Sequence, residues 1–355
     1  MTYLLIHFIT MACWFGPSQI NTKSLDAYWE ITKKIKSGEL VTEQDWETLL
    51  ASDGYRLYIK NNGIDVSTVN IFKEKLTAAC LLEENDSLSA LYKKDRWVQQ
   101  LARTISLQSE TTEHVDKLQT MSYLDSMKVL AYKYLPVRLI QFEYQDPTIY
   151  FLVFDYDGSA NIDGIFMNPL LSFDLDQPKI GAFAAHELHH FIMDQYSKNQ
   201  HQSHIDSTDR GAIWAIKNVA NEGIANMVDK KYVLSEASNY QDKEWYLEKL
   251  KVAPKSVEEI NSSLEKLSSF ADSKLYGAGY WQGVILGNGH FPGYFMACAI
   301  EDAGFHEELK QTVDNPFQFF FLYNKAARSA GNKYPVFSDQ AISLLRDFEK
   351  KYFVK

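Results

Sequence analysis

The chain has 355 residues, of which 46% are hydrophobic and 23% charged, and its formal net charge at pH 7 is −10. This composition is typical of a soluble globular protein with one large domain or two ordinary ones, and the negative charge argues against nucleic acid or an anionic membrane as the main partner. The three cysteines form no C-x-x-C pair, which excludes a thiolate zinc site of that kind and argues against a disulfide scaffold.

The first segment, residues 3–15, is an apolar run of signal-peptide length and is too short to be a stable membrane anchor. It has no basic residue before Lys23, and residues 10–13 resemble a bacterial lipoprotein cleavage site only poorly. We favour a cleaved export leader over residues 1–16 rather than a buried first strand. The protein is then expected outside the cytoplasm of a bacterium, exported or lipid-anchored; without a leader it is cytoplasmic. No later segment is long and apolar enough to cross a membrane.

Residues 17–135 show the spacing of apolar side chains that is typical of amphipathic helices. A first helix is expected to end at Gly38, and the Thr-Glu-Gln-Asp stretch at 42–45 resembles a capping box before the second. Further helices are expected over residues 71–82, 88–107 and 114–134. This region is therefore predicted to be helical, and it carries no catalytic motif.

The periodicity changes after Pro136, where three segments are rich in β-branched and aromatic residues. They predict strands over residues 137–142, 149–154 and 161–168. The third segment ends at Pro169 and is expected to be an edge strand. An edge strand can hold an extended peptide by main-chain hydrogen bonds, so 161–168 is a candidate substrate-binding strand; an ordinary edge strand fits the pattern equally well.

The next predicted helix, around residues 180–193, contains the motif H-E-x-x-H, formed by His186, Glu187 and His190. Residues four apart lie on the same face of a helix, so both imidazoles can reach one metal ion. Glu187 projects beside them, where it could take a proton from a water activated by the metal. Small and apolar flanking residues indicate a buried helix, in which His and Glu need partners, and zinc would supply them.

The assignment of the ligands within this motif has alternatives. His189 allows competing histidine pairings, but His186 and His190 are preferred because their spacing leaves room for Glu187 as a base. A core helix with internally satisfied histidines is the alternative without a metal.

Polar residues lie before and after this helix. Those before it are candidate caps, and those after it are candidate metal ligands. Asp174 or Asp176 is expected to cap its N-terminus, where Pro178 suits the first turn. The polar stretch 199–210 contains His201 and His204, and either could supply a third imidazole ligand.

A second helix over residues 212–227 carries another candidate ligand. Glu222 is a carboxylate among apolar neighbours, an expensive place for an unpaired charge, and a metal would neutralise it. Asn226 lies one turn later on the same face, where it could hydrogen-bond a metal ligand.

H-E-x-x-H followed about thirty residues later by a helical N-E-G-x-A-N resembles the gluzincin group of zinc metallopeptidases. More closely, the chain resembles uncharacterised bacterial families of zinc-dependent peptidases that pair H-E-x-x-H with E-G-x-A. The resemblance covers roughly residues 150–300. It implies that His186, His190 and Glu222 bind one zinc ion and that Glu187 is the general base and acid.

Two positions bear on this resemblance. Asn226 matches the Asp that orients a zinc histidine in related members, and Asn in its place removes a charge while keeping a hydrogen-bond acceptor. Metzincins place a third His six residues after the motif, whereas this chain has Tyr196 there. The spacing therefore argues against that group.

Beyond a helical stretch at 243–275, a glycine-rich segment at 276–294 contains two candidates for stabilising an oxyanion. Gluzincins commonly use a Tyr or a His for this role, and Tyr294 is preferred here over His290. No motif decides between them. The tail is expected to form two packing helices.

Together these observations predict an α+β, mainly α fold. A helical region over residues 17–135 is expected before a zincin-like metallopeptidase domain over residues 136–355, which comprises a small mixed sheet, the H-E-x-x-H helix, the third-ligand helix and a helical C-terminal part. The predicted function is zinc-dependent hydrolysis of peptide bonds in a peptide or protein substrate. The alternatives are a zinc hydrolase of another amide or ester and a non-catalytic zinc-containing binding protein. Cleavage preference, endo- or exopeptidase action and oligomeric state stay open.

Overall fold

The computed structural model describes residues 20–82, 86–198, 204–238, 240–269 and 273–353. The predicted leader lies outside these residues. Within the described part, no helix is long and apolar enough to cross a membrane.

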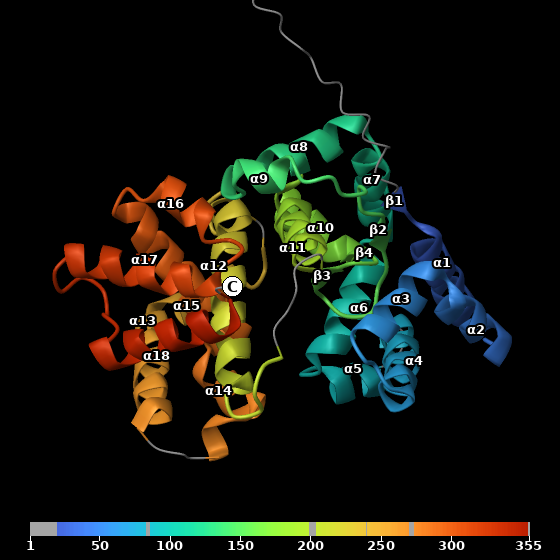
Figure 1. Cartoon of the computed structure of the whole chain (residues 1–355). Helices are drawn as coiled ribbons and strands as arrows, with labels where there is room; N and C mark the ends of the chain where they lie inside the picture. Colours follow the sequence, from blue (N-terminus) through green and yellow to red (C-terminus); the bar gives the residue numbers. More distant parts are fainter. Residues whose placement is uncertain (1–19, 83–85, 199–203, 239, 270–272, 354–355) are drawn as a thin grey trace, which may run out of the picture.

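The first part of the chain is helical, as predicted, and lies on one side of the molecule (Figure 1). Its helices are α1 (Lys23–Lys36), α2 (Glu43–Ala51), α3 (Asp53–Asn61), α4 (Val66–Leu81), α5 (Asp86–Tyr92), α6 (Arg96–Ser106), α7 (Gln108–Leu118) and α8 (Met121–Ala131). The capping box is confirmed, because Thr42 and Asp45 exchange side-chain to backbone hydrogen bonds at the start of α2. The expected helix over 88–107 is divided into two, because Asp95 caps α6 by accepting from the Val98 amide.

A small mixed sheet follows, with the strand order β1-β2-β4-β3. The strands are β1 (Ile20–Asn21), β2 (Ile149–Phe151), β3 (Gly158–Asn161) and β4 (Gly164–Met167). β1, β2 and β4 pair in parallel, and β3 is antiparallel to β4. The α+β, mainly α class is confirmed.

Two of the strand predictions were wrong in detail. Residues predicted as a strand over 137–142 instead begin with a short helix, α9 (Val137–Ile140), whose first turn is closed by amides that donate to the Pro136 carbonyl. In addition, β4 is not an edge strand, because β3 turns back at Asn161–Gly164 and covers it. The edge of the sheet on this side is therefore β3 itself, and the candidate substrate-binding strand has to be moved there.

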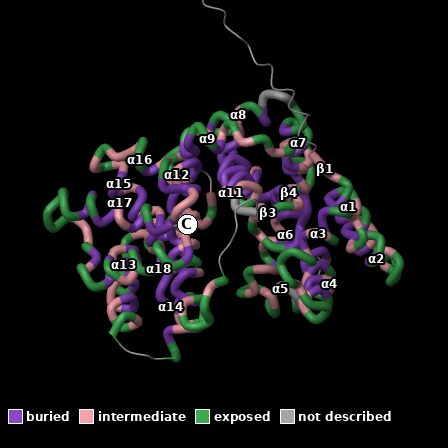
Figure 2. Tube along the Cα trace, in the orientation of Figure 1, coloured by how far each residue is buried: buried purple, intermediate pink, exposed green. Residues whose placement is uncertain are grey.

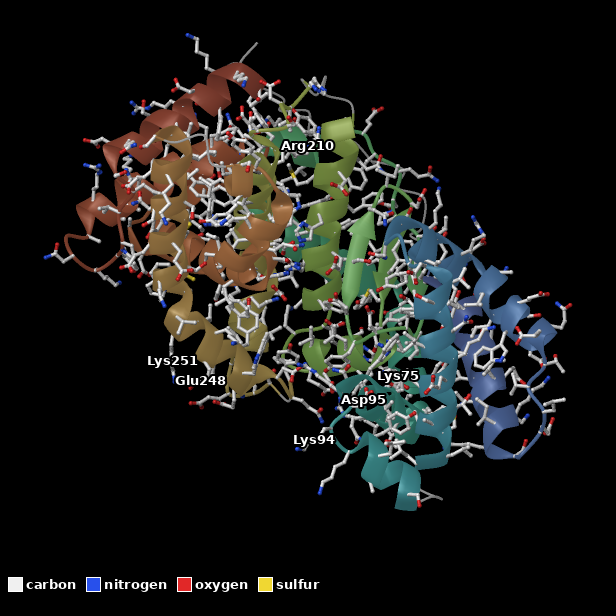
Figure 3. All side chains as sticks on the ribbon, turned by 90° about the horizontal axis from the view of Figure 1, so that it is seen from below. Lys75, Lys94, Asp95, Arg210, Glu248 and Lys251 are labelled. Carbon is white, nitrogen blue, oxygen red and sulfur yellow. The ribbon has the colours of Figure 1, made fainter. Side chains whose placement is uncertain are left out.

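The helical first part packs onto the sheet through specific polar contacts as well as apolar ones. The Tyr55 hydroxyl donates to the Val153 carbonyl (2.6 Å), and the indole of Trp97 donates to the Phe154 carbonyl (2.5 Å). One hydrophobic core runs through both parts of the described chain (Figure 2). Ion pairs also join neighbouring helices, such as Lys75 on α4 with Asp95 before α6 at 2.5 Å (Figure 3).

The remaining helices form the middle and the other side of the molecule (Figure 1). They are α10 (Pro169–Asp176), α11 (Ala182–Lys198), α12 (Arg210–Val233), α13 (Lys243–Ser269), α14 (Ala278–Val284), α15 (His290–Asp302), α16 (His306–Gln311), α17 (Pro316–Ser329) and α18 (Asp339–Tyr352). The helices α11 and α12 pack against each other in the middle of the chain's fold, between the sheet and the C-terminal helices (Figure 1). The tail, residues 315–353, forms the two expected helices, α17 and α18.

Candidate metal centre

The helix that carries H-E-x-x-H is held by a buried carboxylate at its start. Asp176 Oδ1 accepts from the Phe183 amide at 3.2 Å, so Asp176 and not Asp174 has the capping position. Asp174 instead binds Arg103 through both oxygens, at 2.5 and 2.7 Å. The helix is buried along most of its length, which brings His186 and Glu187 into the interior at 4% and 5% exposure.

The three predicted ligands converge from two helices. The Nε2 atoms of His186 and His190 on α11 lie 3.1 Å apart. Glu222 Oε2 on α12 lies 3.6 Å from His186 Nε2 and 3.4 Å from His190 Nε2. Among the described residues, these three form the one group of His, Cys, Asp or Glu side chains arranged to hold a metal ion, with all ligand atoms within 4.8 Å of one another.

The donors fit a divalent cation such as zinc. Glu222 Oε2 is buried and has no hydrogen-bond partner, although imidazole nitrogens surround it. His186 Nδ1 donates to the carboxylate of Asp229 at 3.1 Å, which leaves Nε2 as the acceptor nitrogen that faces the other ligands. Two imidazole nitrogens and one carboxylate oxygen are a ligand set that zinc prefers, and they leave a further coordination position open.

The protonation of the ligands is strongly coupled to the charges around them. Burial raises the pKa of Glu222, but its interactions with the rings of His190, His290 and His186 outweigh burial and hold the pKa well below its usual value. Burial lowers the pKa of His186, but the Asp229 carboxylate outweighs it and raises the pKa to about 10. Metal binding at this site therefore displaces protons from imidazole.

Asp229 was missed by the sequence reasoning. It is fully buried and orients His186 by accepting from Nδ1. It lies seven residues after Glu222, so it returns to nearly the same face of α12 two turns later. That spacing was the available signal. Asn226, expected to hydrogen-bond a metal ligand, instead contacts His290, where its Nδ2 donates to the backbone carbonyl at 3.2 Å.

The two oxyanion candidates on α15 differ in their distance from the ligands. His290 Nδ1 lies 3.1 Å from Glu222 Oε2, and its ring stacks over that of His186 with centroids 6.2 Å apart. Tyr294 lies one turn further along α15. Burial raises its pKa, and a hydrogen bond with Cys298 raises it further. The structure therefore brings His290 into contact with the predicted ligand Glu222, whereas Tyr294 interacts with Cys298.

His290 reaches Glu222 because α12 and α15 approach closely through glycines. A Cβ added at Gly223, directly after Glu222, would lie 2.7 Å from the Gly293 carbonyl oxygen. A Cβ at Gly293 would lie 2.2 Å from the Val219 carbonyl oxygen. Real Cβ atoms do not come this close to backbone, so the two helices require glycine at both positions.

We expect Gly293→Ala to lower the free energy of unfolding by about 1–3 kcal/mol, because the added methyl group forces α15 away from α12. Thermal or urea denaturation measures this. The matched control is Gly283→Ala on α14, where an added Cβ meets nothing within 4 Å and alanine favours the helix. Equal stability of the two variants would show that the close approach is not needed.

The general-base candidate lies beside the edge strand. A Cβ added at Gly158, the first residue of β3, would lie 3.2 Å from Glu187 Oε1, so the strand begins at this carboxylate. Burial raises the pKa of Glu187 above its usual value, although His186 and His190 oppose the shift. A carboxylate with a raised pKa is a better proton acceptor, which suits a general base.

The other histidines near the motif lie outside the ligand group. His189 is buried, with Nε2 3.4 Å from the Tyr134 carbonyl oxygen, and burial lowers its pKa to about 3, so it packs as a neutral side chain. His204 is exposed. His201 lies outside the described residues.

Comparison with known proteins adds an independent line of information. No curated protein and no solved structure matches the chain. Residues 46–332, which are most of the chain, match the family described as "Putative zinc dependent peptidase (DUF5700)". The match includes both metal-ligand helices and most of the helical first part. The chain therefore belongs to the family that carries this description.

Proposed function

We propose that the chain hydrolyses peptide bonds and that His186, His190 and Glu222 hold one zinc ion for this reaction. The observation that carries the proposal is the convergence of these three ligand atoms within 4.8 Å, beside a buried glutamate. Membership of a zinc-dependent peptidase family supports it. When bound, zinc supplies Lewis-acid activation of a water molecule and of the substrate carbonyl.

Glu187 is the proposed general base and acid. It follows His186 directly on α11, so it projects beside the ligands and not among them. Burial raises the pKa of its carboxylate, which makes it a better proton acceptor. In this proposal Glu187 accepts a proton from the attacking water and passes it to the leaving amine.

His290 is the proposed donor to the oxygen that becomes negatively charged, and Tyr294 is the alternative one turn away. His290 lies against Glu222 and so faces the reaction centre. Burial lowers its pKa to about 4, so the ring is neutral at pH 7 and donates an N–H without adding a charge that would repel the metal. Asn226 holds the backbone of His290 in place.

The substrate is proposed to lie along β3. This strand is antiparallel to β4, is the sheet edge next to α11, and begins beside Glu187. An extended peptide can add to such an edge by main-chain hydrogen bonds, which recognises peptides largely independently of side chains. A peptide bond in register with Gly158 is then presented to the general base.

The test combines metal analysis with digestion of a mixed peptide library followed by mass spectrometry. We expect about one zinc per chain and cleavage that a chelator abolishes and added zinc restores. Cleavage of esters or other amides but not of peptides would support the alternative hydrolase. Bound zinc with no hydrolysis of any substrate would support a non-catalytic binding protein and contradict the proposal.

A further inference from the structure

Lys230 is a largely buried lysine whose ammonium group contacts the carboxylate of the preceding residue, Asp229. Its Nζ lies 2.6 Å from Asp229 Oδ2, and only 12% of its side chain is exposed. Consecutive residues of a helix project in different directions and do not normally face each other. Lysine is also rarely buried unless it is paired. The contact therefore requires the side chain to bend across the helix surface, which indicates a specific interaction.

Asp229 needs this interaction because its carboxylate is buried. Its side chain is 1% exposed, and a carboxylate without partners is costly in such a place. One oxygen accepts from His186 Nδ1 at 3.1 Å, and the other accepts from Lys230. With a partner on each oxygen, the carboxylate can neither rotate nor turn away from the imidazole.

Lys230 is itself held in place. Its Nζ lies 5.7 Å from the centre of the Tyr246 ring, within the range of a cation–π contact. The groups Tyr246, Lys230, Asp229 and His186 thus form a chain that runs from α13, through α12, to the proposed ligand on α11.

We propose that Lys230 is a positioning residue that fixes the Asp229 carboxylate and, through it, the His186 ring in the orientation that metal binding needs. The inference rests on the proposed function in one respect, that His186 is a zinc ligand. The expected effect on zinc affinity is opposite to the effect expected from electrostatics alone. Removing a positive charge near a bound cation should strengthen zinc binding by electrostatics, whereas losing the orientation of His186 should weaken it.

The experiment measures the zinc affinity of the zinc-free protein by competition with a chelating dye. We expect Lys230→Met, which keeps the apolar stem, to bind zinc about 10-fold more weakly than wild type. Lys230→Arg, which keeps the charge and a donor, should restore most of the affinity. The matched control is Lys231→Met, which removes the same charge from an exposed neighbour that lies over the Tyr232 ring, and its affinity should be unchanged.

Lys230→Met with zinc affinity equal to or tighter than that of Lys231→Met would overturn the inference. If Lys230→Met does not fold, Asp229→Asn is compared with the double variant Asp229→Asn/Lys230→Met, in which no buried charge is left alone. Equal zinc affinities of these two support action through Asp229, and a further loss in the double variant overturns it.

A parallel measurement on His186→Ala separates this inference from the proposed function. If His186→Ala binds zinc as tightly as wild type, the assignment of His186 as a zinc ligand is wrong, and so is the role proposed for Lys230. If His186→Ala loses zinc while Lys230→Met binds it like wild type, only the role of Lys230 is wrong.

Discussion

Glu222→Ala should lose zinc almost completely, because it removes one of the three ligands and the only carboxylate among them. Changing a residue that only hydrogen-bonds a metal ligand already lowers metal affinity about 10- to 100-fold. Loss of a ligand itself should therefore lower the zinc affinity more than about 100-fold. Metal analysis after dialysis, together with dye competition, measures the effect.

The control for this variant is Glu248→Ala. Glu248 lies on α13 and pairs with Lys251 at the surface (Figure 3), where both side chains are about two-thirds exposed. It carries the same charge as Glu222 and faces solvent. We expect its zinc content to equal that of wild type. Equal zinc in wild type and Glu222→Ala would contradict the ligand assignment.

Glu187→Ala should retain zinc and lose turnover. General acid–base catalysis contributes about 10²- to 10⁴-fold, so kcat/KM should fall by that factor, which corresponds to about 3–5 kcal/mol in the activation barrier. Glu187 is buried, and burial opposes its ionisation, so its removal should not destabilise the fold. The measurement is peptide cleavage at saturating zinc, with the zinc content determined on the same sample.

Glu187→Gln distinguishes loss of the base from loss of shape. Glutamine keeps the size and can donate a hydrogen bond, but it cannot accept the proton from water. It should be as inactive as Glu187→Ala while keeping the same zinc content. Peptide cleavage at the wild-type rate by either variant would rule out Glu187 as the base and would leave the metal site intact.

The sequence predicted the grouping of His186, His190 and Glu222 more accurately than it predicted the sheet. His186 and His190 are joined by one turn of one helix, so their relative position depends only on helix geometry. The strands were harder to predict. Enrichment in β-branched residues indicates that a segment suits a half-buried surface, but it does not fix the backbone conformation of that segment. Residues 137–140 therefore form a helix in spite of their composition, and β3 covers β4 although its own sequence contains small residues.

The role of each group around the ligands depended on contacts that a single helix does not show. Asp229 and Asn226 are both polar residues on α12 after Glu222, yet one orients His186 and the other holds His290. Which of them faces which helix is decided by how α11 and α15 pack on either side of α12. From the sequence, Asn226 was predicted to hydrogen-bond a metal ligand because it lies one turn after Glu222 on the same face of the helix.

By itself, the sequence determined the class of fold, the two ligand helices and the identity of the residues that can bind zinc, because local periodicity sets the face on which each side chain lies. Only the tertiary structure decided that Glu222 meets His186 and His190 and that β3 is the sheet edge beside Glu187. It also decided that Asp229 contacts His186 and that Lys230 contacts Asp229. These contacts join residues far apart in the chain. They depend on how closely helices approach, which here is set by the small residues Gly223 and Gly293.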